Sequence, residues 1–248
     1  MQVTYLSHSG FLLEWEHAYF LFDYYEGELP EFSKEKDLMV FVSHKHGDHY
    51  NRNIWELRKS HPGVTYIVSK DVPLSAGQRE KLNLSDTDMA RVCRVKADET
   101  YCFDAVGGKK LEVITLRSTD EGVAFLISYQ EKIIFHAGDL NLWTWPEESK
   151  QYNEDMTKAF RQQMEKIRGK KIDVAFLPLD GRQGEEAGRG FDIFMETADI
   201  KTAFPMHFWD DYNIITNYLR TRKNKPFCSR IRTINNKGQV FLFALSLK

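Results

Sequence analysis

Short apolar runs separated by polar turns open the chain, and their spacing predicts a β-sheet. The runs at residues 3–6, 11–15 and 19–22 are rich in aromatic and branched side chains, which favours antiparallel strands with a turn at residues 16–18. The run at residues 39–42 is apolar throughout and therefore predicts a buried strand.

The chain then alternates between helical and extended patterns. Helical spacing at residues 51–60 begins at the capping residue Asn51 and stops at Pro62-Gly63. Further helices are predicted at residues 149–168, 192–197 and 212–222, and further strands at residues 64–68, 92–95, 110–116, 123–129, 132–135, 174–177, 229–234 and 240–244. Sheets followed by helices, twice over, predict an α/β (α+β) fold, namely a four-layer αββα sandwich of two mixed β-sheets flanked by helices.

Ligand-type side chains are concentrated directly after the apolar run at residues 39–42. His44, His46, Asp48 and His49 fall within six positions. Such a cluster is costly to desolvate unless it holds a charged partner, so it predicts a metal site. Side chains two apart at a strand exit can face the same way, and a turn at Gly47 would direct the last two residues elsewhere, so one loop could serve two ions. A solvated histidine-rich loop is the alternative, which this density of ligands disfavours.

This H-x-H-x-D-H string after an apolar strand resembles the signature of the metallo-β-lactamase superfamily. Three other segments resemble family motifs in the same order, and they end at Asp23, at Gly138-Asp139 and at His207. The opening segment at residues 5–14 is similar to the branch that includes ascorbate-phosphate lactonase. The resemblance extends along almost the whole chain and implies the αββα fold and a metal-dependent hydrolase.

The resemblance also implies a role for each motif residue. The first metal position would take His44 and His46, the second position would take three ligands, and one carboxylate would bridge them. The ligands of the second position would be Asp48, His49 and His207, and the bridging carboxylate would be Asp139. Imidazole and carboxylate ligands suit zinc, most simply as two ions, with manganese or iron as alternatives.

Two ions about 3.5–4 Å apart can hold a hydroxide that would attack an ester, lactone or phosphoester bond of a small molecule. Asp48 would orient this nucleophile and relay its proton. His8 would help to stabilise the negative charge on the substrate, although a turn histidine is also commonly only polar surface.

The sequence departs from the family pattern in one place. Where the family has another histidine for the first metal, residues 116–122 contain none. Asp120 is the candidate substitute as an oxygen ligand, which would favour a harder metal. The first site could instead be weak, or empty in the isolated protein. The alternative is that Asp120 caps a turn before Gly122.

Asp23 and His136 are predicted to support the ligands without binding metal themselves. Asp23 would accept hydrogen bonds at its strand end, and His136 would lie behind the site or in the interior. His17 and His61 are expected to face solvent.

Trp143, Asp180 and Arg182 are predicted to line the substrate pocket. Arg182, or Arg189, would pair with an anionic substrate, and Trp143 with Trp145 would form an aromatic wall. The alternatives are an exposed flexible loop at residues 180–190 and simple packing of the two tryptophans.

Composition narrows the remaining choices. The 248 residues contain no linker or repeat, which predicts a single domain over residues 1–248. A formal net charge of -2 gives no broad attraction to nucleic acid or to membranes, so a small-molecule substrate is expected and the oligomeric state stays open.

No secretion signal or membrane span is evident, which predicts a cytoplasmic location. Cys93, Cys102 and Cys228 form no C-x-x-C pair and are expected to be buried or half-buried thiols.

Two other functions stay open. Some relatives use iron, so an iron-dependent oxidoreductase on the same fold is one alternative. The missing histidine points to the other, a non-catalytic binding protein with an incomplete metal site. A nucleic-acid processing role is disfavoured because no segment resembles the extra domain or basic arm of the superfamily's nucleases.

Overall fold

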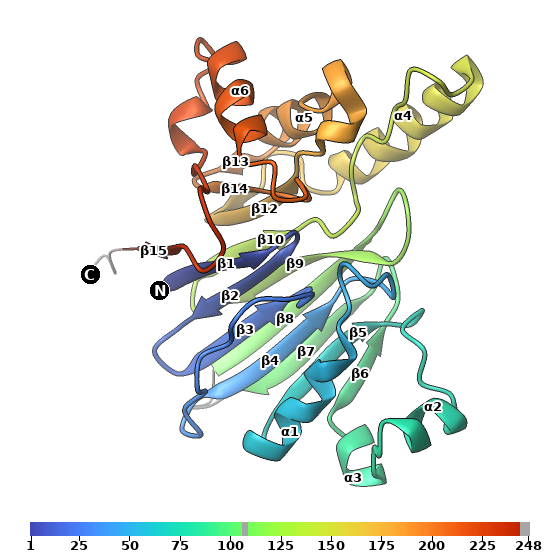
Figure 1. Ribbon diagram of the computed structural model, residues 1–248, viewed down its shortest axis with the longest axis vertical. Coiled ribbons are helices and arrows are strands. Elements are labelled where there is room, and N and C mark those ends of the chain that lie inside the picture. Colours follow the sequence, from blue (N-terminus) through green and yellow to red (C-terminus); the bar gives the residue numbers. More distant parts are fainter. Residues whose placement is uncertain (106–108, 244–248) are drawn as a thin grey trace. The chain divides into compact units, whose positions relative to one another are not determined.

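The computed structural model describes residues 1–105 and 109–243, which form two compact units (Figure 1). The first unit comprises Met1–Lys96 with the described parts of Phe103–Lys110 and Lys237–Lys248, and the second comprises Ala97–Cys102 and Leu111–Asn236. Each unit carries a large mixed sheet with helices, which confirms the predicted α/β class. The single domain over residues 1–248 stays a prediction.

The first unit contains a seven-stranded sheet. Its strands, in spatial order, are β15 (Val240–Leu242), β1 (Gln2–Ser7), β2 (Gly10–Glu14), β3 (Ala18–Phe22), β4 (Asp37–Val42), β5 (Thr65–Ser69) and β6 (Val92–Val95). β1, β2 and β3 are antiparallel as predicted, and β3 to β6 run parallel. The parallel pairing brings the carboxyl ends of β3 and β4 to one edge, where the Asp23 N–H donates to the Phe41 carbonyl oxygen at 2.9 Å.

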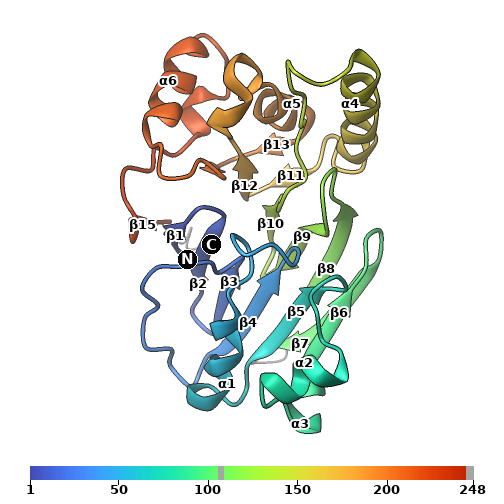
Figure 2. The same ribbon diagram turned by 45° about the vertical axis from the view of Figure 1, so that its right-hand side comes forward.

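Short helices cover one face of this sheet (Figure 2). They are η1 (Arg52–Glu56), α1 (Leu57–Ser60), α2 (Ala76–Lys81) and α3 (Asp86–Met89). Ile54 and Trp55 of η1 enter a core of apolar side chains from β1 to β5. The helix predicted at residues 51–60 is thus a 3-10 turn followed by one α turn, and the side chain of Asn51 caps it by accepting from the Asn53 N–H at 2.9 Å.

The second unit contains most of a six-stranded sheet. The spatial order is β14 (Ala203–Met206), β12 (Val174–Pro178), β10 (Lys132–His136), β9 (Val123–Tyr129), β8 (Lys109–Arg117) and β7 (Thr100–Ala105). β10, β12 and β14 are parallel, so the segments that follow them leave the sheet at the same edge. A separate pair, β11 (Lys171–Ile172) and β13 (Asp199–Ile200), is also parallel.

Helices α4 (Lys150–Glu165), α5 (Arg189–Thr197) and α6 (Asn213–Thr221) belong to the second unit. The Phe194 ring of α5 packs against Phe135 of β10 at 5.7 Å and against Phe160 of α4 at 5.2 Å between centroids. Phe191 of α5 contacts Tyr218 of α6 at 5.1 Å. Aromatic contacts therefore join the three helices to the sheet.

Several expectations from the sequence are wrong. Residues 229–234 form no strand, because η4 (Cys228–Arg230) is a 3-10 helix and Ile231 makes only an isolated bridge to Ala203. The strand predicted at residues 240–244 ends at Leu242, and its residue 244 lies outside the described residues. His61 is buried and not solvent-facing, because its Nε2 bonds the Lys36 carbonyl oxygen at 2.8 Å. Cys102 is exposed, whereas Cys93 and Cys228 are half-buried as expected.

The segment at residues 180–190, for which an exposed flexible loop was one alternative, contains helical structure. It forms the 3-10 helix η3 (Gly181–Glu186) and then enters α5. Gln183 of η3 is buried, and its Nε2 donates to the Leu142 carbonyl oxygen at 2.7 Å while its Oε1 accepts from Asn141 Nδ2 at 3.1 Å. These bonds fix η3 to the segment that follows Asp139. Among the described residues, no helix has both the length and the apolar character needed to cross a bilayer.

Candidate metal centre

Asp23 organises the edge of the first unit's sheet where β4 ends. Its Oδ1 accepts from the Ser43 N–H at 2.7 Å, and its Oδ2 accepts from Ser43 Oγ at 2.6 Å. The same Oδ2 lies 2.8 Å from His49 Nδ1, and both side chains are fully buried. A buried carboxylate accepts a hydrogen bond from the Nδ1–H of its histidine partner. Asp23 therefore leaves the Nε2 lone pair of His49 pointing away from itself. Asp23 therefore lies where the sequence predicted it, behind a ligand candidate.

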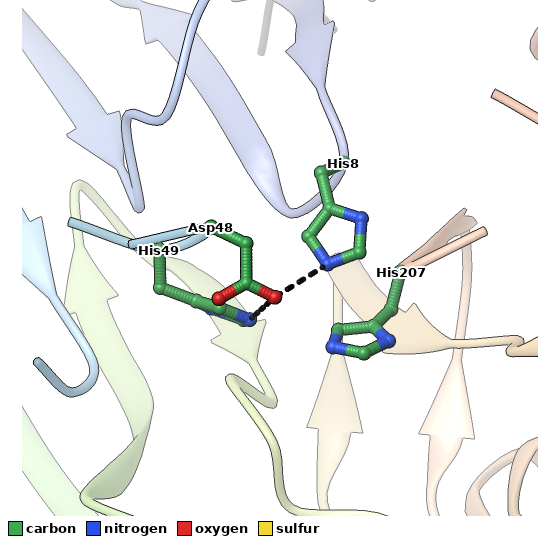
Figure 3. Close-up of side chains that lie close together, drawn as sticks. All are labelled: His8, Asp48, His49 and His207. Atoms are coloured by element: carbon green, nitrogen blue, oxygen red, sulfur yellow. Dashed lines mark ion pairs between the residues drawn. The ribbon is translucent and has the colours of Figure 1, made fainter. Parts of the chain in front are cut away.

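Asp48 lies between two imidazoles of the first unit. Figure 3 shows the rings of His8 and His49 directed toward its carboxylate. His8 Nε2 is 3.3 Å and His49 Nε2 is 4.0 Å from Asp48 Oδ2. Burial opposes ionisation of Asp48, but the hydrogen bond from His8 and the charges of His49 and His8 outweigh it and hold the pKa of this carboxyl well below its usual value. Asp48 is thus an anion between two nitrogen donors.

The backbone of His8 is held in an unusual conformation. Its φ is 52°, in the left-handed region that non-glycine residues seldom adopt. The His8 N–H donates to Tyr5 Oη at 2.9 Å, and the side chain is 98% buried, with a relative exposure of 2%. A polar surface role for His8 does not fit this burial, so the turn between β1 and β2 brings His8 to Asp48.

Four imidazoles pack against one another in the first unit. Ring centroids are separated by 5.6 Å between His8 and His49, by 4.2 Å between His49 and His44, and by 4.6 Å between His44 and His46. One ligand atom each from His8, Asp48 and His49 lies within 4.8 Å of the other two, and His44 and His46 offer a second such pair. Four buried or half-buried imidazoles at this spacing, with a carboxylate beside them, offer the type of ligand atoms that suits a divalent cation.

In the second unit, Asp180 supports His207 as Asp23 supports His49. His207 follows β14 and Asp180 follows β12, and the register of these strands pairs Met206 with Pro178. His207 Nδ1 is 2.8 Å from Asp180 Oδ2, and Asp180 is fully buried. Burial raises the pKa of Asp180, but hydrogen bonds from His207 and Arg182 outweigh burial and lower this pKa to about 2. The geometry gives Asp180 a positioning contact with His207, and its place in the substrate pocket stays a prediction.

Asp139 lies on the Nε2 side of the His207 ring. Its Oδ1 is 3.3 Å from His207 Nε2, and it follows Gly138, whose φ of 51° makes the turn after β10. Trp143 Nε1 donates to the Asp139 carbonyl oxygen at 2.8 Å, and the Trp143 ring lies 5.3 Å from that of His207. Trp143 is buried, so it packs behind the two ligand candidates.

Arg182 faces the solvent side of Asp180. Arg182 Nε is 2.9 Å from each oxygen of Asp180, and Nη2 makes a further contact to Oδ2. Its guanidinium stacks over Trp209 at 5.5 Å, and its side chain is 55% exposed. The Arg182 guanidinium, which was predicted to pair with an anionic substrate, thus pairs with the buried carboxylate of Asp180 in this structure.

The segment without the family histidine does not supply Asp120 to either ligand group. Asp120 is exposed, and its N–H donates to Ser118 Oγ at 3.1 Å within a turn. Among the described residues, it belongs to neither of the groups of ligand atoms. Thr119 instead points inward, where its Oγ1 lies 2.5 Å from the Asn141 carbonyl oxygen and accepts from the Asn141 N–H at 3.0 Å.

His136 and His17 lie away from the ligand groups. His136 is buried in β10, its Nδ1 accepts from the Gly138 N–H at 3.2 Å, and its ring packs on Phe176 at 5.7 Å. It is therefore an interior histidine beside the Asp139 turn, one of the two readings that the sequence allowed. His17 is exposed in the turn between β2 and β3.

Sequence reasoning missed Ser43 and Thr119. Ser43 Oγ joins Asp23 to His44, whose Nδ1 is 3.0 Å away. Its position immediately before the H-x-H-x-D-H string was the available signal. Thr119 carried no comparable signal, because its partner at Asn141 is 22 residues away.

Comparisons with known proteins agree with this architecture. Residues 30–186 match a family model described as the β-lactamase superfamily domain. A metal-dependent hydrolase of Alkaliphilus metalliredigens (strain QYMF) is 26% identical over 247 residues, which covers 95% of this chain and 97% of the relative.

Two solved structures share the fold. Igni18, a metallo hydrolase from the archaeon Ignicoccus hospitalis KIN4/I, has a TM-score of 0.64 at 17% identity, covering 98% of this chain and 99% of that one. CmlA, a diiron β-hydroxylase from Streptomyces venezuelae, has a TM-score of 0.54 at 15% identity, covering 91% of this chain and 51% of that one.

Proposed function

This chain belongs to the metallo-β-lactamase superfamily and is a metal-dependent hydrolase, and we propose that it cleaves an ester, lactone or phosphoester bond of a small molecule. The single observation that carries the proposal is the orientation of His49 and His207. Each donates its Nδ1 proton to a fully buried carboxylate and so presents Nε2 as a ligand. Such an arrangement is typical of metal-binding histidines.

The proposal keeps the ligand set that the family motifs imply, with zinc as the first choice and two ions as the stoichiometry. The ligands are His44, His46, Asp48, His49, Asp139 and His207. Manganese and iron stay alternatives, because the set is borderline and contains no thiolate. When bound, such ions would supply a water molecule that is acidic enough to react near neutral pH and would polarise the bond under attack.

The chain's own residues would orient the reaction. Asp48, kept ionised by His8 and His49, would accept and pass on a proton at Oδ2. His8, fixed by Tyr5, would donate from Nε2 to negative charge on the substrate. Asp23 and Asp180 would hold two ligands in their tautomers. A cytoplasmic location and a substrate pocket that includes Trp143, Asp180 and Arg182 belong with this proposal.

The test is hydrolysis by protein stripped with a chelator and then reloaded with zinc, manganese or ferrous iron. The panel contains 4-nitrophenyl esters, lactones and phosphomonoesters and phosphodiesters. Asp48→Asn and His207→Ala should abolish turnover with an unchanged circular dichroism spectrum. Asp98→Asn, which removes an exposed carboxylate paired with Lys166 and Arg117, is the matched control. Full activity in either site variant, or activity that persists without metal, would overturn the proposal. An iron absorption band with oxygen consumption would favour the oxidoreductase instead.

A further inference from the structure

Trp209 lies on a short segment with an unusual backbone. His207, Trp209 and Asp210 have φ values of 66°, 47° and 60°, so three non-glycine residues within four positions adopt the left-handed region. Such conformations persist only where the surrounding contacts impose them, and they cluster at functional sites. The segment directly follows β14 and begins with a ligand candidate.

This backbone presents an indole to solvent. Trp209 is 47% exposed, whereas Trp15, Trp55 and Trp143 are buried and Trp145 is half-buried. Large aromatic side chains are normally buried, because each carries a large apolar surface. An exposed tryptophan on a strained segment therefore indicates a binding role.

The exposed indole also contacts two neighbouring side chains. The Arg182 guanidinium stacks over it at 5.5 Å, and Arg182 is itself held by the buried carboxylate of Asp180. The Trp209 ring lies 6.3 Å from the ring of His207, at 77° between planes. A preordered ring loses little conformational entropy when a partner binds, so its contact contributes more to affinity.

The charges around Trp209 decide which partner it suits. Arg182 is paired with Asp180, and Asp210 and Asp211 are both exposed on the same segment. Among the described residues of this segment and its Arg182–Asp180 contact, one guanidinium stands with three carboxylates, which does not favour an anionic group. A planar apolar group, by contrast, would gain offset stacking or edge contact with the indole and would lie beside His207.

The geometry points to Trp209 as the residue that determines substrate specificity, by binding an aryl or heteroaryl group of the substrate. Arg182 positions this indole and does not itself bind the substrate's charge. The inference rests on the proposed hydrolase function for its kinetic part, but the binding part can be measured without turnover.

Binding is measured by fluorine NMR on protein labelled with fluorotryptophan. The Trp209 resonance is assigned by its absence in Trp209→Phe. Phenylacetamide and cyclohexylacetamide are the probes, since both are neutral and differ only in having a flat or a puckered ring. The resonance should move with phenylacetamide at a Kd about three- to tenfold lower than with cyclohexylacetamide. An unmoved resonance, or equal affinity for the two rings, would overturn the inference.

Turnover is measured with methyl phenylacetate and methyl cyclohexylacetate, in which a methylene group insulates the ester from the ring. Trp209→Leu should raise KM about three- to tenfold for the aryl ester, with kcat and the cyclohexyl ester little changed. Trp209→Phe should recover most of the preference. Tyr152→Ala is the control, because Tyr152 is 39% exposed on α4, where its N–H donates to Ser149 Oγ and not to the Trp209 segment.

The two parts separate failure of this inference from failure of the proposed function. A selective shift of the Trp209 resonance without hydrolysis of any ester would remove the function and keep the aryl site. Ester hydrolysis that responds equally to Trp209→Leu and to Tyr152→Ala would keep the function and overturn the aryl site.

Discussion

Replacing Asp23 with asparagine tests the link between the buried carboxylate and metal binding. Asp23 accepts from the Ser43 N–H, from Ser43 Oγ and from His49 Nδ1, all within 2.8 Å. In Asp23→Asn, the amide oxygen must stay on the Ser43 N–H, since that buried group has no other acceptor of equal geometry. The amide nitrogen then faces His49 Nδ1 and can only donate to it.

This change reverses the tautomer of His49. Its proton would move from Nδ1 to Nε2, and the lone pair needed for a metal would be lost unless the amide is displaced. Ser43 can adapt, because its hydroxyl can turn toward His44 Nδ1 at 3.0 Å. We therefore expect the metal affinity to fall about 10- to 100-fold, or about 1.4–2.7 kcal/mol.

The assay is competition for zinc against a chromophoric chelator, with metal-free protein prepared in parallel. Glu14→Gln is the matched control, because it removes a carboxylate of the same sheet whose partner is the Lys36 ammonium group and whose side chain is 35% exposed. The control should bind zinc as the unaltered protein does. Equal zinc affinity in Asp23→Asn and Glu14→Gln would show that Asp23 does not support metal binding through His49.

Three further predictions concern stability, each measured by urea unfolding of the metal-free protein. In the folded protein the pKa of Asp180 is lowered to about 2, so its ionised form stabilises the fold by about 2 kcal/mol above pH 3.8, and this stabilisation is lost as the pH falls toward 2. Asp180→Asn should lack this acid dependence. An unchanged pH profile in the variant would contradict this prediction. Gly190→Ala should lower the free energy of unfolding by about 1–3 kcal/mol, because its Cβ would lie 2.0 Å from Asn141 Oδ1. Gly77→Ala, with open space in α2, should raise it by about 0.5–1 kcal/mol. A more stable Gly190→Ala than Gly77→Ala would contradict this prediction. Phe194→Ala should cost about 3–5 kcal/mol by removing contacts to Phe135 and Phe160, and a loss below 1 kcal/mol would show that the site refills.

Elements with a clear apolar period could be predicted from the sequence. β6 and β9 have the predicted bounds, and α4 begins directly after Ser149, whose Oγ accepts from the Tyr152 N–H at 3.1 Å. α2 and α3 contain no buried residue, so no apolar pattern marked them, although Ser85 and Asp88 form a capping box that the sequence did display. The strand at residues 229–234 failed because its buried residues Ile231 and Ile234 are three apart, which is not a strand period.

The residues of the candidate site likewise divide into those that a local motif indicated and those whose contacts depend on tertiary structure. The motif itself indicated the histidines and Asp48, since their spacing is local. The contact of Asp180 with His207 joins residues 27 apart and depends on the pairing of β12 with β14, which no local pattern encodes. The packing of Trp143 behind His207 and the exposure of Trp209 likewise follow from tertiary structure.

We propose that the histidines and carboxylates of the candidate metal centre hold metal for a hydrolytic reaction. The most direct measurement is an anomalous-scattering map from crystals soaked in zinc, recorded on both sides of the zinc absorption edge. We expect two peaks, with His49 Nε2 and His207 Nε2 among their ligands. Absence of any peak beside these nitrogens at saturating zinc, and again at saturating manganese, would show that these residues do not hold metal.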